Sequence, residues 1–361
     1  MGRFENCEWY PVVAIPARNE AERLPRLFEA LSGQSWLDKS GRRLDIVLVL
    51  NGCSDASARV ATRCMARYPK LSIHLFEINF AVAEAHVGSA RRFAMERALQ
   101  MCRHSSRSVL LTTDADAAPT QHWIDANLRA LNAGAAIVGG HILGDEAEEA
   151  LLGPRFLRRA ARQLQYAKLI DHLAALIDPL PYDPWPRHSD HTGASLAVRA
   201  NVYAAVGGIP ALPFREDLAL VSRVRGAGYR LRHPLDVRVR VSARLDGRAP
   251  GGMADCIKAW LKAEEDGLPH LVEDPMSTSA RLRKRRQYRA MSLERPVVTK
   301  RSSHSNSALS PRAAANLLTI PALIEVVAPD EPDASPGIPV EAAIHQIKQM
   351  IADAQSEARV A

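Results

Sequence analysis

The sequence predicts an α/β fold in which helices flank a mostly parallel central sheet. Apolar strand patterns alternate with helical patterns along residues 10–113, an order that is typical of such a sheet. One of these strands, residues 46–50, is continuously apolar, as strands buried on both faces are. The chain has 361 residues, of which 47% are apolar and 24% charged, so it can bury a full core. This composition excludes disorder throughout.

The first predicted unit is a strand, a loop and a helix. Residues 10–15 form the apolar strand, and Leu27, Phe28 and Leu31 share one face of the following helix. Pro25 suits the first turn of that helix, which leaves residues 16–20 in the loop at the carboxyl end of the strand. Open α/β sheets bind ligands at such loops, so we expect a ligand there.

The alternation continues to the fourth strand and resumes after an interruption. The expected elements are a turn over 51–55, helix 56–68, strand 71–76, helix 89–102 and strand 109–113. Residues 145–190 contain a long helical stretch and a proline-rich run, and we interpret them as an insertion that covers the site. Further on we expect strand 194–198, a short helix ending near Gly207, helix 217–227 ended by Gly228, and a strand over 237–241 in which valines and arginines alternate.

The C-terminal third has less regular patterns. We predict an α/β domain over residues 1–265, an irregular basic linker over 266–338 and a C-terminal helix over 339–361. The linker includes the basic run 281–286 and the polar stretch 300–307, so this extension is expected to be partly flexible. Ile344, Ile347 and Ile351 give the last segment its helical spacing.

Charge and cysteine content limit the partners and the compartment. The net charge of +7 arises from 47 Lys and Arg against 40 Asp and Glu, and it favours anionic partners. The five cysteines are far apart and include no C-x-x-C pair, which argues against a disulfide framework or a zinc cluster. Neither a signal-peptide pattern nor a run of ~20 apolar residues is present. We therefore expect a cytoplasmic protein with at most peripheral membrane contact.

The strongest chemical signal is the D-x-D motif of Asp114 and Asp116, directly after the fourth strand. Two carboxylates at the ligand-binding edge of a sheet suit Mg²⁺ or Mn²⁺, which prefer oxygen ligands and keep positions open for phosphates. Such a cation would neutralise a diphosphate leaving group. A bare D-x-D is more often a pair of solvated acids, and its position after a strand is what favours the metal.

Other polar residues follow neighbouring strands or begin helices. Asn51 and Asp55 follow the second strand, where they suit either turn and N-cap chemistry or contact with a nucleotide. Arg91 lies at the start of the helix after the third strand, where a solvated basic helix start or an anion site is equally plausible.

Two further segments carry candidate catalytic and phosphate-binding residues. Glu216 and Asp217 begin a helix, and we select Asp217 as the general base that deprotonates an acceptor hydroxyl. The loop containing Arg244 and Arg248 is rich in glycine and arginine, which suits either a cover over a diphosphate or a flexible surface turn.

In this order the segments 13–20, 51–55, 114–116, 191–194 and 215–218 resemble the family 2 glycosyltransferases of GT-A fold, over roughly residues 10–252. The resemblance implies inverting transfer of a sugar from a nucleotide-diphosphate sugar, by default a UDP-sugar, to an unidentified acceptor hydroxyl. It implies metal binding by Asp114 and Asp116 and a general base at Asp217. The donor-binding positions then comprise Pro16, Ala17, Arg18, Glu20, Asn51, Asp55, Arg91, Asp114 and Ala115. The donor-sugar or acceptor side comprises Thr192, Gly193 and Glu216, and the diphosphate loop comprises Arg244 and Arg248.

The sequence departs from the family pattern in two places and leaves alternatives open. Many relatives carry Asp where Asn51 stands, and the Q-x-x-R-W motif of processive synthases is absent, which favours non-processive transfer. Retaining relatives share most of the motifs, so stereochemistry stays open.

Three other functions compete with sugar transfer. A nucleotidyltransferase would need a glycine-rich basic loop after the first strand, which is missing. A catalytically inactive nucleotide-binding scaffold would keep the fold alone. A basic nucleic-acid-binding protein is disfavoured because only 5% of residues are aromatic and no recognition motif is present. We therefore expect no nucleic-acid partner.

Overall fold

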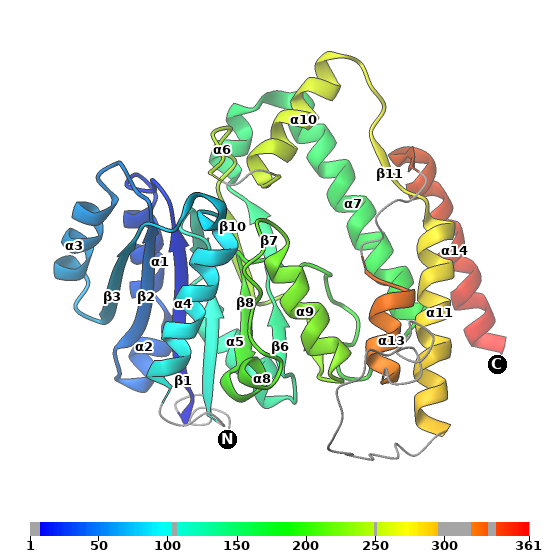
Figure 1. Ribbon diagram of the computed structural model, residues 1–361. Coiled ribbons are helices and arrows are strands. Elements are labelled where there is room, and N and C mark those ends of the chain that lie inside the picture. Colours follow the sequence, from blue (N-terminus) through cyan, green and yellow to red (C-terminus); the bar gives the residue numbers. More distant parts are fainter. Residues whose placement is uncertain (1–7, 103–106, 249–250, 295–318, 331–336, 361) are drawn as a thin grey trace.

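The computed structural model describes residues 8–102, 107–248, 251–294, 319–330 and 337–360. Its centre is a seven-stranded sheet of order β3-β2-β1-β4-β8-β6-β9 (Figure 1). Strands β1 to β4 are parallel to one another, whereas β8 runs antiparallel to both β4 and β6. The strands are β1 Tyr10–Ala17, β2 Leu44–Asn51, β3 Leu71–Ile78, β4 Ser108–Thr112, β6 Ile137–Gly139, β8 Leu196–Arg199 and β9 Leu231–Arg232. The prediction of a mostly parallel α/β sheet is confirmed.

Helices cover both faces of this sheet because successive strand residues point to opposite sides. Val13 and Ile15 pack in the core formed with helices α1, α2, α3 and α5, while Val12 and Ala14 pack in the core formed with α4, α8 and α9. The first group comprises α1 Leu24–Ser32, α2 Ser35–Ser40, α3 Ser57–Arg67 and α5 Trp123–Asn132. The second group comprises α4 Val87–Met101, α8 Ala200–Ala205 and α9 Glu216–Gly226. A short 3-10 helix, η2 Val82–Glu84, precedes α4.

A second, three-stranded sheet joins distant parts of the chain at the ligand-binding edge. Strand β10 (Arg238–Val241) pairs antiparallel with β5 (Ala117–Pro119) and parallel with β7 (His141–Gly144). The alternation predicted for β10 is present, since Arg238 and Arg240 are exposed and Val239 is buried. Strands β5, β6 and β7, of three or four residues each, are absent from the elements predicted from the sequence. The small sheet brings the chain after β10 beside the D-x-D motif: the Ser242 amide donates to the Asp116 carbonyl at 3.3 Å.

The predicted insertion is helical, and it forms part of a second helical group (Figure 1). Asp145 caps α6 (Glu146–Leu151), accepting hydrogen bonds from two amides of its first turn. The long α7 (Gly153–Ile177) then packs against α10 (Met253–Glu265), α11 (Pro275–Glu294) and α14 (Val340–Val360). The expectation that the whole insertion covers the site is therefore too broad. The part that borders the site is α6, through Glu148.

The prediction of an irregular segment over 266–338 is wrong for much of its length. It contains β11 (Leu271–Glu273), the 20-residue α11, α13 (Ile320–Val327) and β12 (Gly337–Pro339), which pairs with β11. The basic run becomes helical because acidic residues from elsewhere neutralise it. Arg281 pairs with Glu273, and Arg285 pairs with Glu325 and Asp330. The polar stretch 300–307 lies outside the described residues.

The C-terminal helix is present as α14, and its apolar face is buried. Ile344, Ile347 and Ile351 pack against Leu173 of α7 and Val272 of β11 in a separate core. Among the described residues, none of the helices combines the length and the apolar character that crossing a membrane requires. The four described cysteines, Cys53, Cys64, Cys102 and Cys256, are free thiols.

Candidate active site

The loops that follow β1 and β2 are joined to each other at the carboxyl edge of the sheet. The Ser54 amide donates to Asn19 Oδ1 at 2.8 Å, and the Ala21 amide donates to Asp55 Oδ2 at 3.0 Å. Asn19 adopts a left-handed φ of 54°, a conformation that asparagine tolerates better than most residues. Asp55 also accepts from the Ser57 amide two residues on, which fits its turn interpretation, whereas the N-cap position of α3 is Ala56. Its carboxylate therefore helps to fix the shape of both loops.

The predicted nucleotide-binding positions on these loops differ in exposure. Pro16 and Ala17 are buried in the last part of β1, and Arg18 is exposed and donates to the Ala85 carbonyl at 3.1 Å. Asn51 is buried at the end of β2, and its amide nitrogen lies 3.4 Å from the His86 carbonyl. Of these four residues, Arg18 therefore has the side chain that is accessible to a ligand, whereas the side chain of Asn51 is buried at the end of β2.

The D-x-D motif begins two residues after β4. Asp114 and Asp116 are half-buried and Ala115 between them is buried. The preceding Thr113 donates from Oγ1 to the Ala194 carbonyl at 2.9 Å, which fixes the motif against the segment 191–194. The D-x-D motif and the predicted sugar-side residues Thr192 and Gly193 therefore lie on adjacent segments of the chain.

Arg91 is the centre of the site, and its guanidinium is buried with a side-chain exposure of 3%. Nη2 donates to Asp114 Oδ1 at 2.7 Å, and Nε donates to Glu216 Oε1 at 2.9 Å. Nη1 donates both to Thr112 Oγ1 at 2.9 Å and to the Gly193 carbonyl at 3.0 Å. Burial acts to lower the pKa of Arg91, but the carboxylates around it outweigh burial and raise it. Arg91 therefore stays charged and links the D-x-D motif to the start of α9.

The second acidic motif occupies the first turn of α9. Glu216 is buried against Arg91, whereas Asp217 is half-buried. Asp217 Oδ2 accepts from the Gly193 amide at 2.6 Å, and Oδ1 accepts from the Leu218 amide at 2.8 Å. The preceding Arg215 has a left-handed φ of 58°, which turns the chain sharply into the helix. These contacts fix the carboxylate of Asp217 beside Gly193.

Arg244 closes the site on its other side. Its guanidinium forms two hydrogen bonds of 2.6 Å with the buried carboxylate of Glu20, and Nη2 lies 2.9 Å from Asp116 Oδ2. Burial and the neighbouring Asp114 raise the pKa of Asp116 to about 6, although Arg244 acts to lower it. Arg248 is exposed and donates to the Asn19 carbonyl at 3.3 Å. Both arginines thus reach the first loop.

The donor chemistry of the D-x-D motif fits a hard divalent cation. Each carboxylate uses one oxygen in an arginine pair, namely Asp114 Oδ1 with Arg91 and Asp116 Oδ2 with Arg244. Monodentate carboxylate ligands need only the other oxygen. A cation there would meet the positive charges of both Arg91 and Arg244, so its binding depends on negative charge from a ligand.

Predicted site residues from six separate segments of the chain are therefore brought together. Arg91 contacts Asp114, Glu216 and Gly193, and Arg244 contacts Asp116 and Glu20. The sequence did not identify Glu148, whose Oε2 accepts from Ser242 Oγ at 2.7 Å and from the Ala243 amide at 2.8 Å. Glu148 is one of three acidic residues in the first turn of α6, so the sequence does not indicate which of them contacts the segment 242–243. Glu148 anchors the segment that leads into Arg244.

The α/β sheet and the acidic site at its carboxyl edge define a glycosyltransferase of the GT-A class. Residues 12–176 match the family model described as "Glycosyl transferase family 2". The match includes the first two loops, Arg91 and the D-x-D motif. It confirms, for these residues, the family resemblance found in the sequence.

The chain is also similar to three solved structures. A mannosyltransferase from Pyrobaculum calidifontis, in complex with GDP-Man and Mn²⁺, is 16% identical, with 96% of this chain and 86% of that chain covered and a TM-score of 0.43. TarS 1–349 of S. aureus, in complex with UDP, is 12% identical, with coverages of 78% and 72% and a TM-score of 0.44. The glucosyl-3-phosphoglycerate synthase of Mycobacterium tuberculosis, with Mn²⁺, UDP and phosphoglyceric acid, is 16% identical, with coverages of 74% and 83% and a TM-score of 0.39. No curated protein matches the sequence.

Gly193 has no room for a side chain, because a Cβ atom there would lie 2.4 Å from Cζ and Nη2 of Arg91. We predict that Gly193→Ala displaces the guanidinium and lowers the free energy of unfolding by about 1–3 kcal/mol, the usual cost of overpacking. Gly33→Ala is the matched control, since its Cβ would meet only ordinary contacts of 3.6 and 3.8 Å. Urea unfolding of both variants measures the difference. Equal stability of the two variants would contradict the tight packing of Arg91 on Gly193.

Proposed function

We propose that this glycosyltransferase moves a sugar from a nucleotide-diphosphate sugar to an acceptor hydroxyl in a metal-dependent, inverting and non-processive reaction. The observation that carries the proposal is the buried link from Asp114 through Arg91 to Glu216, at 2.7 and 2.9 Å. It holds the candidate metal-binding motif and the candidate base in one site at the carboxyl edge of a parallel sheet, where ligands of such sheets bind.

The donor would bind across the loops after β1, β2 and β4. Pro16, Ala17, Asn51 and Ala115 would form its apolar and amide surroundings, and Arg18 is exposed beside them. Asp55 would act by fixing the two loops to each other. Arg91 would act through Asp114 and Glu216, because its buried guanidinium already contacts protein groups. UDP is the first nucleotide to test, because the sequence resemblance implies a UDP-sugar by default.

The chemical step would use the carboxylates and arginines of the site in distinct roles. A divalent cation at Asp114 and Asp116 supplies charge neutralisation of the diphosphate when it is bound. Arg244 and Arg248, which contact the first loop, would bind the diphosphate oxygens. Glu216 holds Arg91, and Thr192 and Gly193 border the space for the sugar. In this proposal Arg244 and Arg248 lie on the diphosphate side of the site, and Thr192 and Gly193 lie on the sugar side.

Asp217 would take the proton of the acceptor hydroxyl. The acceptor oxygen forms a bond to the anomeric carbon as the bond from that carbon to the diphosphate breaks, and the bonding electrons leave with the diphosphate. Attack from the face opposite the leaving group inverts the anomeric configuration. The amides of Gly193 and Leu218 orient the carboxylate for this role.

Nucleotide binding tests the metal site. We predict that UDP, GDP or TDP binds the parent protein more tightly with Mn²⁺ than without it, and that Asp116→Asn weakens the Mn²⁺-dependent binding at least ~10-fold, as removal of a ligand oxygen should. Titration calorimetry measures each affinity. Asp38→Asn is the control, because Asp38 is an exposed acidic residue of α2 that pairs with Lys70. If none of the three nucleotides binds in either metal condition, the nucleotide-sugar proposal fails.

Product analysis tests the role of Asp217. We predict that Asp217→Asn lowers the rate of nucleoside diphosphate release about 10²–10⁴-fold, the usual contribution of a general base, while donor affinity changes little. The assay uses the donor that binds best, with water as acceptor, and follows nucleoside diphosphate by chromatography. Release of nucleoside monophosphate and sugar 1-phosphate instead would show attack on the α-phosphate, the reaction of a nucleotidyltransferase. Tight donor binding without any release by the parent would indicate an inactive scaffold.

A further inference from the structure

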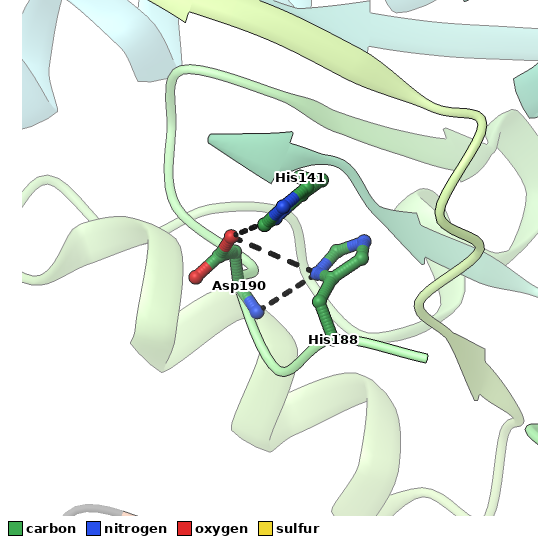
Figure 2. A group of neighbouring side chains, drawn as sticks. All are labelled: His141, His188 and Asp190. Carbon is green, nitrogen blue, oxygen red and sulfur yellow. Dashed lines mark hydrogen bonds and ion pairs between the residues drawn. The ribbon is translucent and has the colours of Figure 1, made fainter. Parts of the chain in front are cut away.

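A cluster of two histidines and one aspartate lies apart from the D-x-D motif, between β7 and the segment that follows the proline-rich run. Figure 2 shows His141 and His188 directed at the carboxylate of Asp190. His141 Nδ1 lies 2.8 Å from Asp190 Oδ2, and His188 Nδ1 lies 3.8 Å from the same oxygen. One ligand atom from each of the three side chains falls within 4.8 Å of the others. The two imidazole rings are stacked with their centroids 4.9 Å apart.

These distances are close to those of ligands around one small cation. With bonds of ~2.0–2.1 Å and tetrahedral angles, ligand atoms around zinc lie roughly 3.4 Å apart. The observed 2.8 and 3.8 Å lie on either side of this value, so small side-chain rotations suffice to form the site. Asp190 is already oriented, because Oδ2 accepts from the Ile142 amide at 3.0 Å.

The protein atoms around the cluster leave His188 incompletely satisfied. Its side chain is 4% exposed, and Nδ1 accepts from the Asp190 amide at 3.0 Å. Among the residues that the structure describes, Nε2 of His188 has no hydrogen-bond partner. The neighbouring His233 differs, since its Nδ1 lies 2.8 Å from Asp183 Oδ2 and its Nε2 lies 3.1 Å from His191 Nδ1. Because Nδ1 is the nitrogen that faces Asp190, a cation in the cluster would bind Nδ1 in place of the Asp190 amide, and the neutral ring would keep its proton on the buried Nε2.

We propose that His141, His188 and Asp190 bind a divalent transition-metal ion such as Zn²⁺. Imidazole nitrogens select transition metals over Mg²⁺, whereas the all-oxygen D-x-D motif suits hard cations. The chain therefore has two cation sites of different chemistry.

The ion would fix the approach to the sugar side of the active site. Residues 191 and 192 connect Asp190 to Gly193, whose amide donates to Asp217 at 2.6 Å. Segment 188–190 already packs closely on the junction of β6 and β7, where a Cβ on Gly139 would lie 2.3 Å from the Asp190 carbonyl. A metal that ties Asp190 to β7 would thus stabilise the position of Gly193.

Metal binding by the tag-free, full-length protein tests this proposal. After dialysis against EDTA, we expect one equivalent of Co²⁺ to give the visible absorption of a four- or five-coordinate ion, and Zn²⁺ to abolish it by competition. Zn²⁺ should also raise the melting temperature, because a ligand that binds the folded state stabilises it. If the parent shows neither the absorption nor the rise in melting temperature, the proposal is overturned.

Variants assign the site to these residues. His141→Gln and Asp190→Asn should each weaken Co²⁺ binding more than ~10-fold. Loss of a residue that only hydrogen-bonds to a metal ligand already weakens binding by ~10-fold or more, and loss of a ligand should cost at least as much. His74→Gln is the matched control, because His74 Nε2 pairs with Asp45 at 3.0 Å elsewhere on the sheet. Asp116→Asn should keep the Co²⁺ absorption, which separates this site from the D-x-D motif. Unchanged Co²⁺ affinity in both cluster variants would overturn the assignment, and circular dichroism checks that they are folded.

Discussion

The buried guanidinium of Arg91 is the interaction on which the active site depends. It neutralises Asp114 and Glu216, which come from β4 and α9, and it fills the space that Gly193 leaves open. Without this charge, two carboxylates would face each other in a poorly solvated region, at a cost of several kcal/mol. The planar fork of arginine can serve Asp114, Glu216 and Gly193 at once, which the point charge of lysine cannot.

A second arginine gives the site its asymmetry. Arg244 is more accessible than Arg91, with a side-chain exposure of 16% against 3%, and it pairs with Glu20 and Asp116. A cation at Asp116 would be repelled by Arg244, whereas a diphosphate would attract both. In the proposed reaction, the cation and the diphosphate therefore each strengthen the binding of the other. Arg91 holds Asp114 and Glu216 in place on the other side of the site. The small sheet of β5, β10 and β7 makes this possible by placing Arg244 beside the D-x-D motif.

The fold and the order of the motifs could be predicted because they depend on local patterns. The strands β1, β2 and β4 are apolar runs, and the D-x-D motif lies directly after one of them. The role of Arg91 could not be predicted from the sequence. A basic residue near the start of a helix indicates an anion site, and only the structure shows that Arg91 is buried against Asp114 and Glu216. Helix α11 was missed because its arginines are neutralised by Glu325 and Asp330, which are distant in sequence. The cluster of His141, His188 and Asp190 likewise forms only when the chain folds.

The most direct test of the central role of Arg91 is a double-mutant cycle on the free energy of unfolding, with Arg91→Met and Glu216→Gln made singly and together. These side chains lie 2.9 Å apart and are both buried, so each single variant leaves the other group without its partner. Residues in such contact show coupling energies of about 0.5–3 kcal/mol, so the double variant should lose clearly less stability than the sum of the singles. Strictly additive losses would show that Arg91 and Glu216 act independently and would contradict this account of the site.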